Sequence, residues 1–149
     1  MSIKIDRINI SIIKHLNDGR KSFKEIATKL SITENTVRSR VNTMIKEGIL
    51  TIKGLVDPEL IPNHQLILIG VKLKTVDLVN KGREFSNLKG VLSASVVTGR
   101  YDLILTVLLN EDFSLLQFYT DEVSRIEDVM SVETFVVYKG YKNFVPYVL

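Results

Sequence analysis

A segment beginning at Thr33 places hydroxyl, amide and guanidinium side chains at helical spacing. At about 100° per residue, the side of this expected helix opposite its apolar residues is polar. Such side chains can bind a nucleic-acid duplex. Arginine forms two hydrogen bonds with guanine, asparagine forms two with adenine, and serine or threonine forms hydrogen bonds with base edges or phosphates. The alternative interpretation is a solvated surface helix. The polar side carries Asn35, Ser39, Asn42, Thr43 and Lys46, with Arg38 and Arg40 on its flanks.

Three short helices are expected to position these side chains. Asp6, Ser22 and Thr33 are residue types that favour helix N-caps, and apolar residues repeat at helical spacing after each of them. Gly48 suits the left-handed position where the third helix ends. Residues 49–52 and 53–56 predict two brief strands around a basic turn. Two helices joined by a tight turn and followed by a basic hairpin predict a winged helix-turn-helix over residues 1–56, with the third helix as the recognition element. Its buried side is predicted to carry Val37, Val41, Met44 and Ile45.

The charge distribution along the chain supports this assignment. The 149 residues carry a net charge of +3. Residues 1–56 hold 11 Lys and Arg against 5 Asp and Glu, for a net +6, whereas residues 57–149 hold 9 against 12, for a net −3. A basic segment joined to an acidic one suggests a nucleic-acid-facing or membrane-facing end, although a lysine-rich surface alone would give the same count.

Several function classes are excluded or disfavoured by composition. The chain has no cysteine and only two histidines, far apart in sequence, so no tetrahedral metal site and no cysteine redox chemistry are expected. Glycine-rich phosphate-binding loops are missing. The longest apolar stretches, 66–71 and 103–109, are far shorter than the roughly 20 residues of a membrane-spanning helix. With no leader at the start, we expect a cytoplasmic protein that is not an enzyme and needs no cofactor or metal.

A linker and a second domain are expected after the helical segment. Two prolines mark residues 57–64 as a linker, because proline removes a backbone donor and restricts its neighbour. Residues 65–149 then alternate in the order βαββαβ, which predicts a ferredoxin-like sandwich and an α+β fold for the whole chain. The expected strands are 65–73, 91–97, 103–109 and 130–138, and the expected helices are 77–88 and 112–125, the second with Phe113, Leu116, Tyr119 and Val123 along one stripe.

Two of these strands are apolar on both faces. Strand 103–109 alternates Leu103, Leu105 and Val107 with Ile104 and Leu108, and strand 65–73 is similar. Because both helices of this fold cover one face of the sheet, the other face needs a different cover. We therefore expect two copies to pair through their sheets as a homodimer. The alternative is that the tail, residues 140–149, folds over the open face.

The chain resembles the Lrp/AsnC family of bacterial and archaeal transcription regulators over about residues 5–138. The segments that carry the resemblance are 6–13, 24–41, 46–50, the Asp57-Pro58 pair and 98–102, in this order. Asn9, where an acidic residue is common, and Pro62, where glycine is frequent, depart from the family pattern. The resemblance implies an N-terminal DNA-binding domain and a C-terminal domain for effector binding and oligomerisation, with dimers that assemble into tetramers or octamers.

The resemblance also implies a small-molecule site, usually for an amino acid, near the turn Gly99-Arg100-Tyr101-Asp102. Arg100 could meet a carboxylate, Asp102 an ammonium group, and Thr134 could add a hydroxyl. The alternative is a plain hairpin turn with Tyr101 packed in an oligomer interface.

The predicted function is a sequence-specific regulator that binds double-stranded DNA. Two alternatives are a sirohaem decarboxylase-like enzyme, disfavoured because His64, Arg83, Arg100 and Arg125 are few groups for a tetrapyrrole, and an effector-sensing module without DNA binding. The residues expected to contact bases or nearby phosphates are Thr33, Asn35, Thr36, Arg38, Ser39 and Asn42, with Lys24, Arg40 and Lys53 on the DNA backbone.

Overall fold

The computed structural model describes residues 4–149, which divide into two compact units. The first unit ends at Lys53 and the second runs from Gly54 to Leu149. The predicted linker, residues 57–64, contains a short 3-10 turn, η1 (Pro58–Leu60), and belongs to the second unit. Among the described residues, no helix is long and apolar enough to cross a bilayer.

The first unit is a three-helix domain with the caps that the sequence predicts. Helices α1 (Arg7–Leu16), α2 (Phe23–Leu30) and α3 (Glu34–Lys46) begin after Asp6, Ser22 and Thr33, and each of these side chains accepts a hydrogen bond from a backbone N–H of the first turn. Ile12, Ile26, Val37, Val41 and Met44 form a core that excludes solvent almost completely. Ile45, which was predicted to face inward, is 44% exposed.

The hairpin predicted over residues 49–56 is not formed, and this part of the sequence interpretation is wrong. Residues 50–54 have no regular structure, and the two-residue strand β1 (Leu55–Val56) pairs antiparallel with β6 (Val145–Pro146) near the end of the chain. The basic turn at Lys53 is therefore an extended segment that leaves the helical unit. Sequence periodicity could not reveal this pairing, because the partner strand lies far along the chain.

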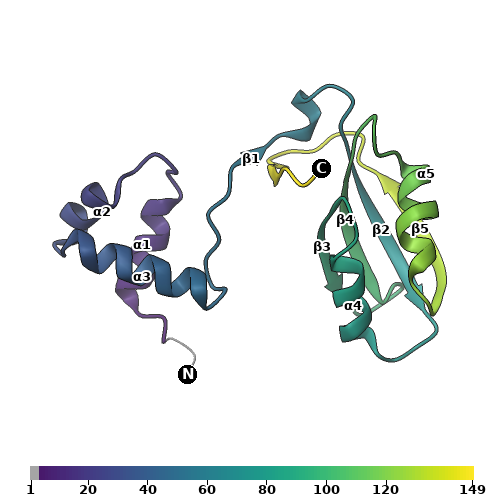
Figure 1. Ribbon diagram of the computed structural model, residues 1–149, viewed down its shortest axis with the longest axis horizontal. Coiled ribbons are helices and arrows are strands. Elements are labelled where there is room, and N and C mark those ends of the chain that lie inside the picture. The colour runs from purple at the N-terminus through teal and green to yellow at the C-terminus, as the bar shows by residue number, and fades with distance from the viewer. Residues whose placement is uncertain (1–3) are drawn as a thin grey trace. The chain divides into compact units, whose positions relative to one another are not determined.

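The second unit is built on a four-stranded antiparallel sheet in the order β3-β4-β2-β5 (Figure 1). Its strands are β2 (Gln65–Leu73), β3 (Val91–Val96), β4 (Leu103–Leu109) and β5 (Val129–Val136), which follow the predicted ranges to within two residues at each end. The two apolar strands, β2 and β4, lie side by side in the middle, with Ile69 opposite Leu105. This strand order confirms the ferredoxin-like α+β fold.

Helical segments cover one face of the sheet. Helix α4 (Leu78–Ser86) buries Phe85 and brings Gly82 close to Val96 and Leu103. The second predicted helix is shorter than expected: α5 (Leu115–Gln117) starts after Ser114 and continues as a π-helical turn (Phe118–Glu122) and a 3-10 turn (Val123–Arg125). Phe118 is buried, whereas Leu116, which was predicted to lie on the buried stripe, is 72% exposed.

The other face of the sheet, called the open face below, retains exposed apolar side chains. Leu68 of β2 and Phe135 of β5 face each other across the strands and are 36% and 41% exposed. The tail does not bury its aromatic residues there: Phe144 and Tyr147 remain 56% and 50% exposed, and the tail pairs with β1. Leu66, Leu68, Ile104, Leu108 and Phe135 are apolar residues on the open face, and of these Leu108 is fully buried.

Candidate nucleic-acid interface and ligand-binding turn

Helix α3 presents an exposed polar face because its apolar residues are buried in the core. Val37, Val41 and Met44 point into the three-helix core. On the opposite side, three amide and hydroxyl side chains are solvent-exposed and make no side-chain hydrogen bond within the described residues, whereas the Thr43 hydroxyl donates to the Ser39 carbonyl oxygen at 2.9 Å. Those predicted to read bases and found in this state are Asn35, Ser39 and Asn42.

Thr33 and Thr36 lie at the start of the same helix and are partly used by its cap. The Thr33 hydroxyl accepts from the Thr36 N–H at 3.1 Å and lies 2.8 Å from the Thr36 hydroxyl. These bonds satisfy a backbone donor that the first helical turn would leave unpaired. Both threonines are therefore next to the N-terminal end of α3, where they also set the geometry of the helix.

Arg38 is held on two sides. Its Nη2 lies 2.7 Å from the Glu34 carboxylate, one turn earlier on α3, and its guanidinium lies 5.4 Å from the centre of the Phe23 ring on α2. Both arrangements leave the arginine side chain 55% exposed. The sequence analysis did not assign Glu34 or Phe23 to the site, although the four-residue spacing of Glu34 and Arg38 is typical of a helical ion pair.

Arg40, predicted to contact the DNA backbone, is bonded to two residues of the first helix and its cap. Its Nη1 donates to Asp6 Oδ2 and to Asn9 Oδ1, each at 2.8 Å. Asn9 is buried, and its side-chain oxygen is the second acceptor for Arg40. Because Asp6 also caps α1, these bonds connect the start of α1 to α3. These contacts pair the charge of Arg40 with that of Asp6 and leave the arginine side chain 29% exposed.

The Asp6 interactions predict a stability change with pH. The Asn9 N–H, together with Arg40, lowers the pKa of Asp6 below its ordinary 3.8. A lowered pKa means that the stabilisation is complete above the ordinary value and is lost as the pH falls through the folded-state value. We expect Asp6→Asn, which can still cap the helix, to have a lower free energy of unfolding than the wild type at pH 7. The two proteins should have the same free energy of unfolding once the pH is well below 3.8. Urea unfolding followed by far-ultraviolet circular dichroism measures this, and the same stability difference at both pH values would contradict it.

The lysines of the interface lie beside α2 and at the end of the unit. Lys24 is exposed on α2 and, with Lys21 and Lys29, lines a shallow hollow of about 280 Å³. Lys53 is exposed in the extended segment after the helices. Neither Lys24 nor Lys53 forms an ion pair among the residues that the structure describes. Their charges are therefore free to meet phosphates.

The turn at residues 99–102 lies at one end of the open face. Gly99 has a φ of +128°, which explains the need for glycine. The Tyr101 ring lies on Gly70, where any Cβ would approach it to 2.6 Å, and the ring packs edge-on against Phe135. The Tyr101 hydroxyl donates to Glu133, and this bond raises the pKa of Tyr101.

The two charged residues of this turn have different surroundings. The Leu73 N–H donates to Asp102, and Lys72 Nζ lies 2.8 Å from its other oxygen, so the pKa of Asp102 is lowered and both oxygens are occupied. Arg100 is 76% exposed, and its ion pair among residues 4–149 is with Glu133, at 2.8 Å. Glu133 was not predicted, since it lies far along the chain and no local pattern marks it. The exposed charges are Arg100 and Glu133.

Thr134 is not brought together with this turn. In β5 it follows Glu133, and successive residues of a strand point to opposite faces. Its hydroxyl lies 2.5 Å from the Tyr119 hydroxyl on the helix-covered side. The structure therefore separates Thr134 from the residues with which the sequence analysis grouped it.

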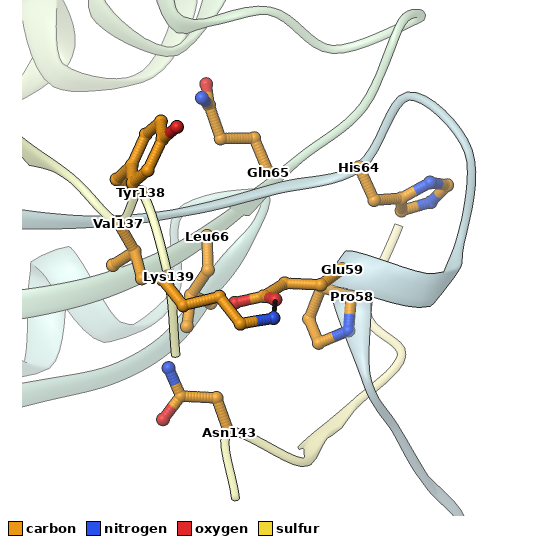
Figure 2. A pocket seen from close by; sticks show the side chains of 9 residues that line it. All are labelled: Pro58, Glu59, His64, Gln65, Leu66, Val137, Tyr138, Lys139 and Asn143. Atoms are coloured by element: carbon orange, nitrogen blue, oxygen red, sulfur yellow. Dashed lines mark hydrogen bonds and ion pairs between the residues drawn. The ribbon is translucent and has the colours of Figure 1, made fainter. Parts of the chain in front are cut away.

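A cleft of about 450 Å³ lies at the other end of the sheet (Figure 2). It was not predicted from the sequence. Its charged lining residues, Glu59 and Lys139, satisfy each other at 2.6 Å. Lys139 and the Gly140 N–H lower the pKa of Glu59, and His64 lies 3.2 Å from the Tyr147 hydroxyl. These contacts tie the tail to the start of the second unit and leave no free charge in the cleft for an ionic ligand.

Two family models match the chain in the order of its two units. Residues 5–51 match the model described as a winged helix-turn-helix DNA-binding domain. Residues 66–146 match the model described as the Lrp/AsnC ligand binding domain. Together these matches include α3, the turn at residues 99–102 and the four-stranded sheet from Leu66 onward.

Relatives and solved structures agree over nearly the full length. The HTH-type transcriptional regulator Ptr1 of Methanocaldococcus jannaschii is 27% identical over 141 residues, covering 93% of this chain and 95% of that protein. Regulatory protein AsnC of Escherichia coli is 25% identical over 136 residues, covering 89% and 90%. The solved structure of E. coli AsnC aligns with a TM-score of 0.69 at 24% identity, covering 93% of this chain and 95% of that one. A Neisseria meningitidis regulator in complex with L-Met aligns with a TM-score of 0.71 at 21% identity, covering 98% and 96%.

Proposed function

Because the chain belongs to the Lrp/AsnC family of helix-turn-helix transcription regulators, we propose that α3 reads specific base pairs in the major groove of its target DNA. The family is one of DNA-binding regulators with a ligand-binding domain, and not of enzymes. The observation that carries the proposal is the exposed polar face of α3, whose amides and guanidinium face solvent while the apolar side is buried. The residues proposed to contact bases or nearby phosphates are Thr33, Asn35, Thr36, Arg38, Ser39 and Asn42.

The phosphate contacts are assigned to residues whose charges are free. Lys24 on α2 and Lys53 after the helices meet this condition. Arg40 does not, because its Nη1 donates to Asp6 and Asn9 and its charge is paired with the Asp6 carboxylate. We therefore assign Arg40 to holding α3 in place.

The base-reading role of α3 is tested by Arg38→Ala. We expect this variant to lose roughly 1 to 3 kcal/mol, or about 5- to 150-fold in affinity, on the preferred duplex and little on an unrelated duplex, because a forked arginine–guanine contact is specific to one base pair. Fluorescence anisotropy on both duplexes measures the two losses. An equal loss on both would place Arg38 on a phosphate and contradict base reading by this residue.

We propose that two copies associate through their open faces. Leu68 and Phe135 would be removed from water by such pairing, and an exposed apolar sheet face of this kind is typical of an interface. The tail does not compete for this face, since it pairs with β1. A dimer supplies two recognition helices for two half-sites.

We further propose that the second domain binds a zwitterion, such as an amino acid, at Arg100 and Glu133. Arg100 uses one nitrogen on Glu133 Oε2, so its other N–H donors can meet a carboxylate, and Glu133 Oε1, which has no partner among the described residues, can accept from an ammonium group. Asp102 is not assigned to the ligand, because both its oxygens are occupied. The N. meningitidis regulator of the same fold was solved with L-Met, an amino acid.

Calorimetric titration with the individual amino acids tests the ligand proposal. We expect at least one to bind the wild type and Arg100→Ala to abolish that binding, because the variant lacks the group that meets the carboxylate. Arg125→Ala is the matched control, since this exposed arginine follows the π-helical turn and lies outside the open face. Unchanged binding by Arg100→Ala, or no binding of any amino acid, would contradict the proposal.

A further inference from the structure

Arg38, on the flank of the polar face of α3, is restrained by two contacts within the protein. Its Nη2 donates to Glu34 at 2.7 Å, and its Cζ, the central carbon of the guanidinium group, lies 5.4 Å from the centre of the Phe23 ring. The two contacts come from different helices, α3 and α2. The side chain is therefore restrained along the recognition helix and across it.

These contacts leave the hydrogen-bonding fork available. An arginine has five N–H donors, and the contact to Glu34 uses one of them. The side chain remains 55% exposed, so the other donors can reach a partner outside the protein. A guanine offers two acceptors, O6 and N7, which match two parallel N–H groups.

Glu34 is unusual in a surface expected to meet phosphates, because a carboxylate repels them. It occupies the first turn of α3, where recognition helices place the residues that contact base edges. As a contributor to helix stability alone, an exposed pair at this spacing is weak. Holding a flexible arginine in one orientation gives the carboxylate a second effect, since less side-chain freedom is lost on binding.

We propose that Glu34 and Phe23 are positioning residues that hold Arg38 in the orientation for reading a guanine, and that Glu34 thereby sets the specificity of the protein at one base pair of each half-site. This inference rests on the proposed function of α3. Glu34 contributes specificity and lowers overall attraction to DNA, whereas the neighbouring lysines raise attraction without specificity.

The test compares Glu34→Gln with Glu47→Gln in the full-length protein. Both changes remove one negative charge from α3 or its end, but Glu47 is the C-cap residue and its side chain has no partner among residues 4–149. Affinity is measured for the duplex preferred by the wild type and for the same duplex with the G·C pair read by Arg38 replaced by A·T. Arg38→Ala identifies that pair.

The expected results separate charge from positioning. Both variants should bind unrelated DNA more tightly than the wild type, because each has lost a repulsive charge. The wild type and Glu47→Gln should discriminate between the two duplexes by roughly 5- to 150-fold. Glu34→Gln should lose most of this discrimination while its thermal unfolding midpoint stays close to the wild-type value. Phe23→Leu, which keeps an apolar side chain on α2, should lose part of the discrimination between the two duplexes.

Two results would overturn the inference, and they have different meanings. If Glu34→Gln discriminates as well as Glu47→Gln, Glu34 has no positioning role, and base reading by α3 is unaffected. If the wild type does not discriminate between any duplexes, base reading fails and the inference fails with it.

Discussion

Affinity for the preferred duplex is expected to fall about 10³- to 10⁵-fold when the salt concentration rises from about 50 to 200 mM, on the basis of roughly 6 to 10 phosphate contacts by a dimer. The physical reason is counterion release, because each lysine or arginine that neutralises a phosphate frees a bound cation. Residues 1–56 carry a net charge of +6, and two such domains would face one duplex.

The slope of this salt dependence can be assigned to particular residues. Anisotropy titrations at several KCl concentrations give the slope for the wild type and for Lys24→Gln. The variant should have a slope smaller by about one for each copy bound. Arg38→Ala on the preferred duplex is the contrasting case, since a base contact changes affinity at every salt concentration. An affinity that does not respond to salt would contradict phosphate contact by this surface.

Leu68→Glu is expected to convert a dimer into a monomer and to weaken binding to a duplex with two half-sites by about 10²- to 10⁴-fold. Leu68 lies on the open face opposite Phe135, so the substitution places a charge where we propose that two sheets meet. The loss in DNA affinity follows because linked recognition helices bind with an avidity that a single helix lacks.

Sedimentation measures the mass of the variant, and anisotropy measures its affinity. Val79→Glu is the matched control, because Val79 is 67% exposed on α4, on the helix-covered side of the sheet. Thermal unfolding shows that both variants are folded. A wild type that sediments as a single 16.9 kDa chain, or a Leu68→Glu variant that remains dimeric, would contradict pairing through the open face.

Local signals in the sequence located most of the fold. The three N-caps of the first unit, at Asp6, Ser22 and Thr33, depend on residues within three positions, so the sequence predicts them directly. The ends of β2 and β4 were predicted for a similar reason, because apolar runs are bounded by polar turns. The π-helical turn after α5 was missed, since a change of helical phase has no composition signal, and the predicted stripe was wrong at Leu116, which is exposed while Phe118 is buried.

The candidate site was harder to predict than the fold, because the availability of a polar side chain depends on distant partners. Arg40 is as polar as Arg38, but Asp6 and Asn9 lie more than 30 residues away in sequence and occupy it. Asp102 is occupied by Lys72 in the same way, from 30 residues away. Residue type and helical angle indicated the face of α3, and only the folded contacts separated free groups from occupied ones.

Selection of bound sequences from a random duplex library by the full-length protein tests the central claim most directly. The claim is that paired copies present two α3 helices that read bases. We expect enrichment of two half-sites related by two-fold symmetry, with centres about 10 to 10.5 base pairs apart or a multiple of that spacing, and loss of one guanine preference in each half-site with Arg38→Ala. Recovery of a library with no enriched sequence, or of a lone half-site bound by one chain, would contradict the account.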